Sequence, residues 1–337
     1  MGTIERLVST AALAILCGGC SSGARWTEPT AESAGRLTEL NGVNFNGVNF
    51  NGVRLNALPF AGLSLGGQAL TGVTLAGATL AGFLPGGDQV SGRNLVGAIL
   101  AGTLSNGMAV TLRIDDVTSG EPADILRYSL SMGVDPGGTF APFCTSTDGT
   151  QAQAIPLAGS WDESSGTASG GAHLDEPSTF TFACEGYALA KCVEMGYAPW
   201  LTVTECKAPG DCADRSLASF HQACTRMLRA DYCGDGTPTT RDGTKVDLWD
   251  HFGIQGDDQP AWNLEAEWSA AGSVCVDRTR WATSPDGSDV EAYIQDHCPE
   301  RWQAPGCGGD ASTFFTPPGF DAPLASRSLL RTRIDHP

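Results

Sequence analysis

The chain has 337 residues with 38 acidic and 20 basic side chains, a formal net charge of −18 at pH 7. Such an acidic protein repels phosphate backbones and anionic lipid surfaces, so we exclude nucleic acid as a partner. The domain organisation is predicted from two other features, the 12 cysteines and one segment with a glycine at nearly every fifth position.

The first 20 residues have the composition of an export signal. Arg6 precedes an apolar run from Leu7 to Leu16, which is too short to span a bilayer and is typical of a cleaved signal peptide. Small residues directly before Cys20 resemble the lipidation motif of bacterial lipoproteins. We expect residues 1–20 to be a lipoprotein signal peptide and residues 21–37 a polar linker, with Cys20 lipidated and serving as a membrane anchor.

The expected location is the outer membrane or the cell surface. Ser21 follows the lipidated cysteine, where an aspartate commonly retains lipoproteins in the inner membrane. Secretion without a lipid anchor is the alternative.

A period of five residues extends over residues 38–104. Large apolar side chains recur every fifth residue from Leu40 to Leu100, with Pro85 as the exception in type, and glycine follows two positions after nearly every one. A period of five fits neither an α-helix nor a strand. Glycine at each corner permits the sharp backbone turns of a coil with a square cross-section.

This segment resembles the pentapeptide-repeat family, and the resemblance implies a short right-handed quadrilateral β-helix. Thirteen units at four per turn make about three coils, near the lower limit for an independent stack. The segment is expected to act as a spacer or platform.

Ten cysteines remain once Cys17 is removed with the signal and Cys20 is lipidated. All ten follow the repeat, and an even number in an exported protein predicts five disulfides. Cys206–Cys212, Cys298–Cys307 and Cys192–Cys224 are plausible pairs. The ten are Cys144, Cys184, Cys192, Cys206, Cys212, Cys224, Cys233, Cys275, Cys298 and Cys307.

Residues 105–308 are predicted to be a disulfide-stapled, strand-rich α+β domain, followed by an extended C-terminal tail over 309–337. Alternating apolar residues predict a hairpin from 110–114 and 126–132 and further strands at 180–184 and 262–268. Helices are expected over about 188–195 and 215–229, the second capped by Asp214.

The sequences AKCVEMGYAPW (190–200) and HQACTRMLRADYCGDGT (221–237) resemble the ADYC-domain proteins. The resemblance covers about 200 residues, and the family name is spelled by Ala230, Asp231, Tyr232 and Cys233. It implies no catalytic residue, because the family is defined by sequence and has no established activity.

His221 and Asp231 are the residues we would assign to an active site if the protein is an enzyme. His221 and Cys224 lie three residues apart on one predicted helix, but the apolar face that carries Cys224 favours a buried disulfide over a nucleophilic thiolate. His221 is then expected to cap or pack near that bridge.

No cofactor is expected, and two metal sites are less favoured alternatives. Cys206, Cys212, His221, Cys224 and Cys233 lack the spacing of structural zinc sites. The weak calcium candidates are Asp235 and Asp242, in a turn-rich acidic stretch without the spacing of a known calcium loop.

Two further expectations concern exposure. Glu265 and Glu267 alternate with Trp262, Leu264, Ala266 and Trp268, so both carboxylates are expected on the solvated face of a strand. The cysteine-free, polar stretch from Thr237 to Asp250 is expected to be a surface loop able to bind a partner, with Thr239 and Asp242 exposed.

The sequence favours an exported cell-envelope lipoprotein that presents a rigid, disulfide-stapled domain for binding or assembly. Its partners are the membrane, through the lipid anchor, and an unknown protein or glycan. The alternative is an exported hydrolase that acts on envelope or environmental polymer at a site near His221 and Asp231. Whether the protein is an enzyme stays open, with binding favoured.

Overall fold

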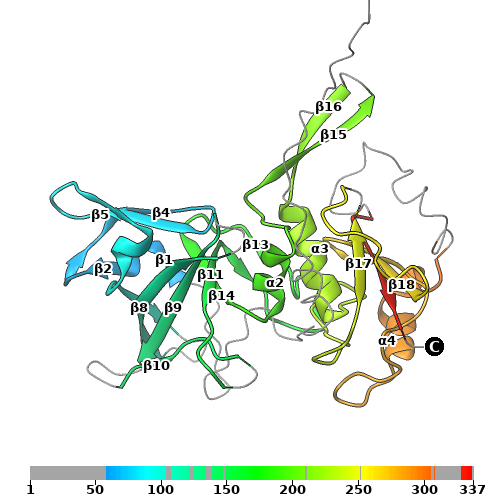
Figure 1. The fold of residues 1–337 in the computed structure, drawn as a ribbon. Helices are drawn as coiled ribbons and strands as arrows, with labels where there is room; N and C mark the ends of the chain where they lie inside the picture. The colour runs from blue at the N-terminus through cyan, green and yellow to red at the C-terminus, as the bar shows by residue number, and fades with distance from the viewer. Residues whose placement is uncertain are drawn as a thin grey trace, which may run out of the picture.

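The computed structural model describes residues 58–103, 108–120, 124–133, 139–146, 149–208, 211–250, 252–304, 307 and 328–335. These residues form a strand-rich α+β protein with few helices, as predicted (Figure 1). The predicted signal, linker and first part of the repeat, Cys20 included, lie outside the described residues.

One large antiparallel sheet dominates the N-terminal half (Figure 1). Its strands follow the order β1-β14-β11-β9-β8-β7-β2-β3, and β10 pairs with β9. The strands are β1 (Leu58–Pro59), β2 (Leu63–Leu65), β3 (Gln68–Ala69), β7 (Ile99–Thr103), β8 (Ala109–Ser119), β9 (Leu126–Gly133), β10 (Ala141–Pro142), β11 (Ala154–Ala158) and β14 (Thr179–Cys184). The predicted hairpin is present as β8 and β9, and the predicted strand at 180–184 lies in β14.

The expected β-helix is not present in the described part of the repeat. Residues 58–103 form antiparallel strands, whereas a β-helix stacks its coils in parallel. Besides strands of the large sheet, they form the 3-10 helices Phe60–Gly62 and Gly92–Leu95 and a three-stranded sheet of β4 (Thr71–Ala76), β5 (Thr79–Phe83) and β6 (Gln89–Ser91).

Two features of the repeat explain this difference. The anchor residues Leu70, Leu80 and Leu95 are buried, so the apolar period does mark the face turned to the core. Gly67 and Gly77, however, adopt positive φ values of 78° and 59° and lie in turns that reverse the chain. Reversal produces hairpins, which satisfy the same apolar period by antiparallel pairing.

The repeat shares a sheet with the region that follows it. Strand β7, from the end of the repeat, pairs with β8 over residues 99–103 and 109–113. Leu100 and Leu112 are directly opposite each other, and both are fully buried. The described repeat therefore packs into the core of the large sheet and does not stand apart as a spacer.

A second antiparallel sheet lies in the C-terminal half, with the order β17-β20-β18-β19. Its strands are β17 (Asp247–Asp250), β18 (Asn263–Ser269), β19 (Gly272–Val276) and β20 (Leu330–Ile334). The predicted strand at 262–268 corresponds to β18. The segment expected as an extended tail supplies β20, an interior strand whose Leu330 and Ile334 are buried.

The described residues of this half also form the helices α2 (Ala188–Glu194), α3 (Ala218–Arg229) and α4 (Val290–His297) and the 3-10 helix Pro299–Arg301. Helix α3 packs between α2 and the second sheet (Figure 1). The first two helices were predicted within a few residues. Asp214 does not cap α3, since it lies in a strand; the Ser216 hydroxyl accepts the Ala218 amide instead.

Two small hairpins lie outside both sheets, β12 (Ser160–Trp161) with β13 (His173–Leu174), and β15 (Thr202–Ala208) with β16 (Asp211–Ser216). The β15–β16 hairpin projects from the body of the protein (Figure 1). It carries a disulfide, Cys206–Cys212, between residues that are directly opposite in the ladder.

All ten predicted cysteines are paired in five disulfides. Cys192–Cys224 and Cys206–Cys212 are confirmed as pairs. The suggested Cys298–Cys307 loop is wrong, because contacts distant in sequence decide the pairing. Cys144–Cys184, Cys233–Cys298 and Cys275–Cys307 are the other three bridges.

Candidate functional site

The residues Ala230 to Cys233 form a turn that ends helix α3. Ala230 has a left-handed conformation, with φ of 50°, and terminates the helix. The carboxylate of Asp231 is fully buried, accepts the amides of Asp235 and Gly236 at 3.1 and 3.0 Å, and pairs with Arg226. Burial raises the pKa of Asp231, while Arg226 opposes that shift. Asp231 therefore organises the turn and has no access to a substrate.

Tyr232 joins the same turn to the second sheet through a buried ion pair. Its hydroxyl donates to Glu265 at 2.8 Å and accepts the backbone N–H of Arg280 at 2.8 Å. The Arg280 guanidinium donates to both oxygens of Glu265, at 3.0 and 3.1 Å, and to the Met227 carbonyl at 3.0 Å. The side chains of Arg280 and Glu265 are both 0% exposed.

The expectation that Glu265 and Glu267 face solvent is wrong. Strand β18 lies between β20 and β19, and packing covers both of its faces. The alternation of residue types along the strand therefore does not identify a solvent-exposed face. Glu267 is also buried and pairs with Arg331 at 2.6 Å. Arginines from elements distant in the sequence neutralise both carboxylates, and strand periodicity alone does not reveal such partners.

His221 is a structural residue packed inside the protein. Its side chain is buried, its Nε2 donates to the Leu189 carbonyl at 3.0 Å, and its ring lies 5.9 Å from that of Trp161. Burial lowers the pKa of His221 to about 4. Cys224, one turn along α3, is held in its disulfide with Cys192. The predicted packing role of His221 is confirmed, and no Cys–His nucleophilic pair exists here.

The two calcium candidates are placed apart from any metal-binding arrangement. Asp235 accepts the Thr237 amide at 2.9 Å and the Tyr293 hydroxyl, whereas Asp242 lies on an exposed turn. Within the described ranges, no three His, Cys, Asp or Glu side chains gather as metal ligands. The cysteines considered for zinc are all in disulfides.

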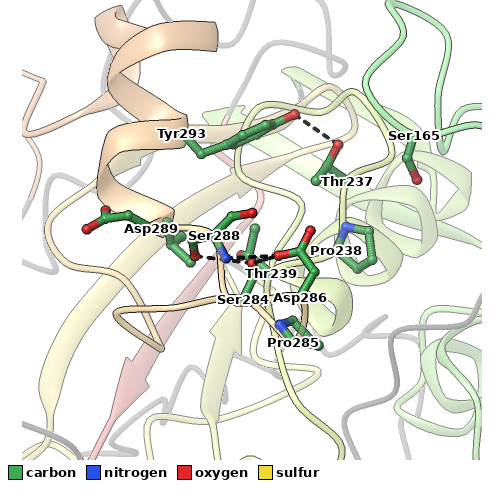
Figure 2. A pocket seen from close by; sticks show the side chains of 11 residues that line it. Ser165, Thr237, Pro238, Thr239, Ser284, Pro285, Asp286, Ser288, Asp289 and Tyr293 are labelled. Carbon is green, nitrogen blue, oxygen red and sulfur yellow. Dashed lines mark hydrogen bonds between the residues drawn. The ribbon is translucent and has the colours of Figure 1, made fainter.

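A pocket of about 350 Å³ lies beside the turn formed by Ala230–Cys233 (Figure 2). One wall is the segment 237–239 that follows the ADYC residues, and the opposite wall is the turn 284–289 with the start of helix α4. Its lining residues are Ser165, Thr237, Pro238, Thr239, Ser284, Pro285, Asp286, Ser288, Asp289, Val290 and Tyr293. The pocket is therefore built from three segments that are distant in sequence.

Tyr293 and one disulfide hold the two walls together. The Tyr293 hydroxyl donates to Asp235 and lies 2.9 Å from Oγ1 of Thr237, on the opposite wall (Figure 2). Burial, followed by the hydrogen bond to Asp235, raises the pKa of Tyr293 to about 12. Cys233, just before the first wall, is bonded to Cys298, just after helix α4. The pocket is thus a pre-formed feature of the fold.

Two carboxylates border the pocket, and both are fixed by local hydrogen bonds. Asp286 accepts the Ser284 hydroxyl at 2.5 Å and the Ser288 amide at 3.0 Å (Figure 2), and these bonds lower its pKa to about 2. Asp289 caps helix α4 by accepting the Ala292 amide at 2.9 Å. Both serve as hydrogen-bond acceptors, and the low pKa of Asp286 excludes it as a general acid at neutral pH.

The sequence identified only part of this site. Thr237 does border the pocket, but the expectation of an exposed Thr239 is wrong: it is buried and its hydroxyl donates to the Ala230 carbonyl at 2.7 Å. The expected surface loop also ends early, because Asp247–Asp250 is the buried strand β17. The wall at 284–289 was missed. Its signal was the sequence Pro285-Asp286-Gly287, a common turn, followed by an N-capping Asp289. Such local signals predict a turn and a helix start but no pocket.

The comparisons with known proteins identify one family. The model of the ADYC domain matches residues 92–282, more than half of the chain. No curated protein and no solved structure matches the chain. The match includes the turn at 230–233 and one wall of the pocket, and ends two residues before the wall at 284–289.

Protonation of His221 is predicted to destabilise the fold in acid. The pKa is about 4 in the folded protein and about 6.5 in the unfolded chain, so the unfolded state binds the proton first. The contribution of neutral His221 to the free energy of unfolding is fully present above pH 6.5. About 3 kcal/mol of this free energy is lost as the pH falls to 4. Denaturant unfolding at pH 7.5 and pH 4 should show this loss in the wild type and a smaller one in His221→Gln.

The matched control is His297→Gln, because His297 is partly exposed on helix α4. This variant should keep the wild-type dependence of stability on pH. An equal dependence in wild type and His221→Gln would show that His221 is not the group responsible.

Proposed function

The chain belongs to the ADYC-domain family, and we propose that it is an exported cell-envelope lipoprotein that binds a ligand in the pocket between residues 237–239 and 284–293. The observation that carries this proposal is the pocket itself. It lies against the turn at Ala230–Cys233, a disulfide and Tyr293 link its two walls, and polar groups of three segments border it.

The disulfides indicate an oxidising, exported environment. Among the described residues, no helix has the length and apolar character needed to cross a bilayer. We propose that lipid on Cys20 attaches the protein to the outer membrane or cell surface.

Binding is favoured over catalysis by the chemistry of the lining residues. The pocket is lined by serine, threonine, proline, aspartate, valine and tyrosine, and no histidine, cysteine or lysine of the described part of the chain borders it. Activation of a hydroxyl nucleophile needs an adjacent base, and Asp286 and Asp289 already accept hydrogen bonds from their own turn and helix. Burial of His221 and Asp231 gives the hydrolase alternative no support.

Lipidation predicts the cellular fraction in which the protein is found. In a bacterial host, the wild type should sediment with membranes, whereas Cys20→Ala should move to the soluble exported fraction because it lacks the lipid acceptor. Cys17→Ala is the matched control and should remain with membranes. A wild-type protein that is already soluble would contradict the proposed anchor.

Blocking the pocket should abolish partner recovery from intact envelopes. Ser165 is an exposed residue at the edge of the pocket, so Ser165→Trp places a bulky side chain at the opening without entering the core. Crosslinking of intact cells should capture a partner with the wild type and not with Ser165→Trp.

The control for this experiment is Gln259→Trp, an equally bulky change at an exposed position outside the pocket. It should capture the same partner as the wild type. Capture that is unchanged in Ser165→Trp would show that binding takes place elsewhere on the protein.

A further inference from the structure

We propose that the pocket takes a neutral, hydroxyl-rich ring, such as one sugar unit of a glycan. This inference rests on the proposed binding function, since it names the ligand class for the same pocket. Three features of the pocket support this ligand class: its volume, its lining of apolar and polar residues, and the carboxylate acceptors at its border.

The volume and apolar surfaces of the pocket fit a sugar-sized ring. At about 350 Å³ the pocket is at the lower end of the range for small-molecule sites. Pro238, Pro285 and Val290 supply apolar surface, and Tyr293 closes one side (Figure 2). A pyranose ring presents C–H groups on its faces and hydroxyls at its rim, so it matches a lining that contains both apolar and polar groups.

The carboxylates require a ligand that donates hydrogen bonds. An ionised carboxylate offers about four acceptor positions. The Ser284 hydroxyl and the Ser288 amide both donate to Oδ1 of Asp286, and the Ala292 amide donates to Oδ1 of Asp289. The remaining positions accept hydrogen bonds from a ligand, and the hydroxyls of a sugar are suitable donors.

Charge argues against an anionic ligand. Among the residues that the structure describes, no lysine, arginine or histidine lines the pocket, and the chain as a whole has a net charge of −18. A phosphate or carboxylate on the ligand would find no basic side chain among these residues to compensate for the water it loses on entering the pocket, and this disfavours binding.

The exposure of the carboxylates favours a neutral ligand over a cationic one. Asp286 and Asp289 are both exposed, so water and salt screen their charges, and an ion pair with an ammonium group adds little affinity there. The two carboxylates then contribute to ligand binding mainly as hydrogen-bond acceptors with a defined direction, and a neutral hydroxyl can donate to them.

The test is ligand-observed NMR by saturation transfer from the full exported chain, with rings that share one scaffold. Glucose, galactose, mannose and N-acetylglucosamine are the neutral probes. Glucosamine at pH 6 carries an ammonium group, and glucose 6-phosphate carries an anion. At least one neutral ring should bind, within about threefold of the affinity of glucosamine, and glucose 6-phosphate should bind about tenfold more weakly or not at all.

Two variants locate the binding. Ser165→Trp should remove the signal of the neutral rings, while Asp258→Asn, which removes an exposed carboxylate outside the pocket, should keep it. A signal that survives in Ser165→Trp overturns the proposal, because the ring then binds elsewhere.

The remaining outcomes separate this inference from the proposed function. If glucosamine binds tenfold more tightly than the neutral rings, the pocket is an ammonium site; if glucose 6-phosphate binds more tightly than they do, it is an anion site. If no ring binds, sugars are excluded. Each of these results overturns the proposed ligand class. The proposed function survives these results if Ser165→Trp still abolishes capture of the envelope partner, and fails if that capture is unchanged.

Discussion

The second half of the protein is organised around one buried ion pair. Arg280 and Glu265 are both without solvent exposure, and Tyr232 bonds to each of them. Two isolated charges in such a position would destabilise the fold, and only their pairing, together with the hydrogen bonds to Tyr232 and the Met227 carbonyl, makes their burial tolerable. The pair therefore requires helix α3, the ADYC turn and strand β18 to meet in one arrangement.

This arrangement extends from the interior to the pocket. Tyr232 lies one residue after Asp231, whose carboxylate holds the amides of Asp235 and Gly236. Gly234 follows with a positive φ of 70°, and a Cβ there would lie 1.8 Å from the Ala271 carbonyl oxygen, so only glycine fits. The chain then reaches Asp235, which accepts the hydroxyl of Tyr293 from the opposite wall. The ADYC residues thus shape the pocket while none of the four lines it.

The sequence was sufficient to predict those features that depend on local structure. The strands at 110–114 and 126–132, the two predicted helices and the existence of five disulfides followed from periodicity and cysteine number. It was insufficient where distant segments decide the outcome. The glycine repeat specified turns but not whether they reverse the chain, and Glu265 looked solvent-facing because Arg280, its neutralising partner, comes from another segment. Sequence spacing carried no sign of the pocket because its walls meet only after folding.

A double-mutant cycle on Arg280 and Glu265 is the most direct test of this account. The free energy of unfolding would be measured with the disulfides intact for wild type, Arg280→Met, Glu265→Met and the double variant. Each single change should cost about 3–5 kcal/mol, because it leaves one buried charge without its partner. The double change should cost at least about 2 kcal/mol less than the sum of the two. Single changes that cost under about 1 kcal/mol each, and add without coupling, would contradict the claim that this ion pair organises the fold.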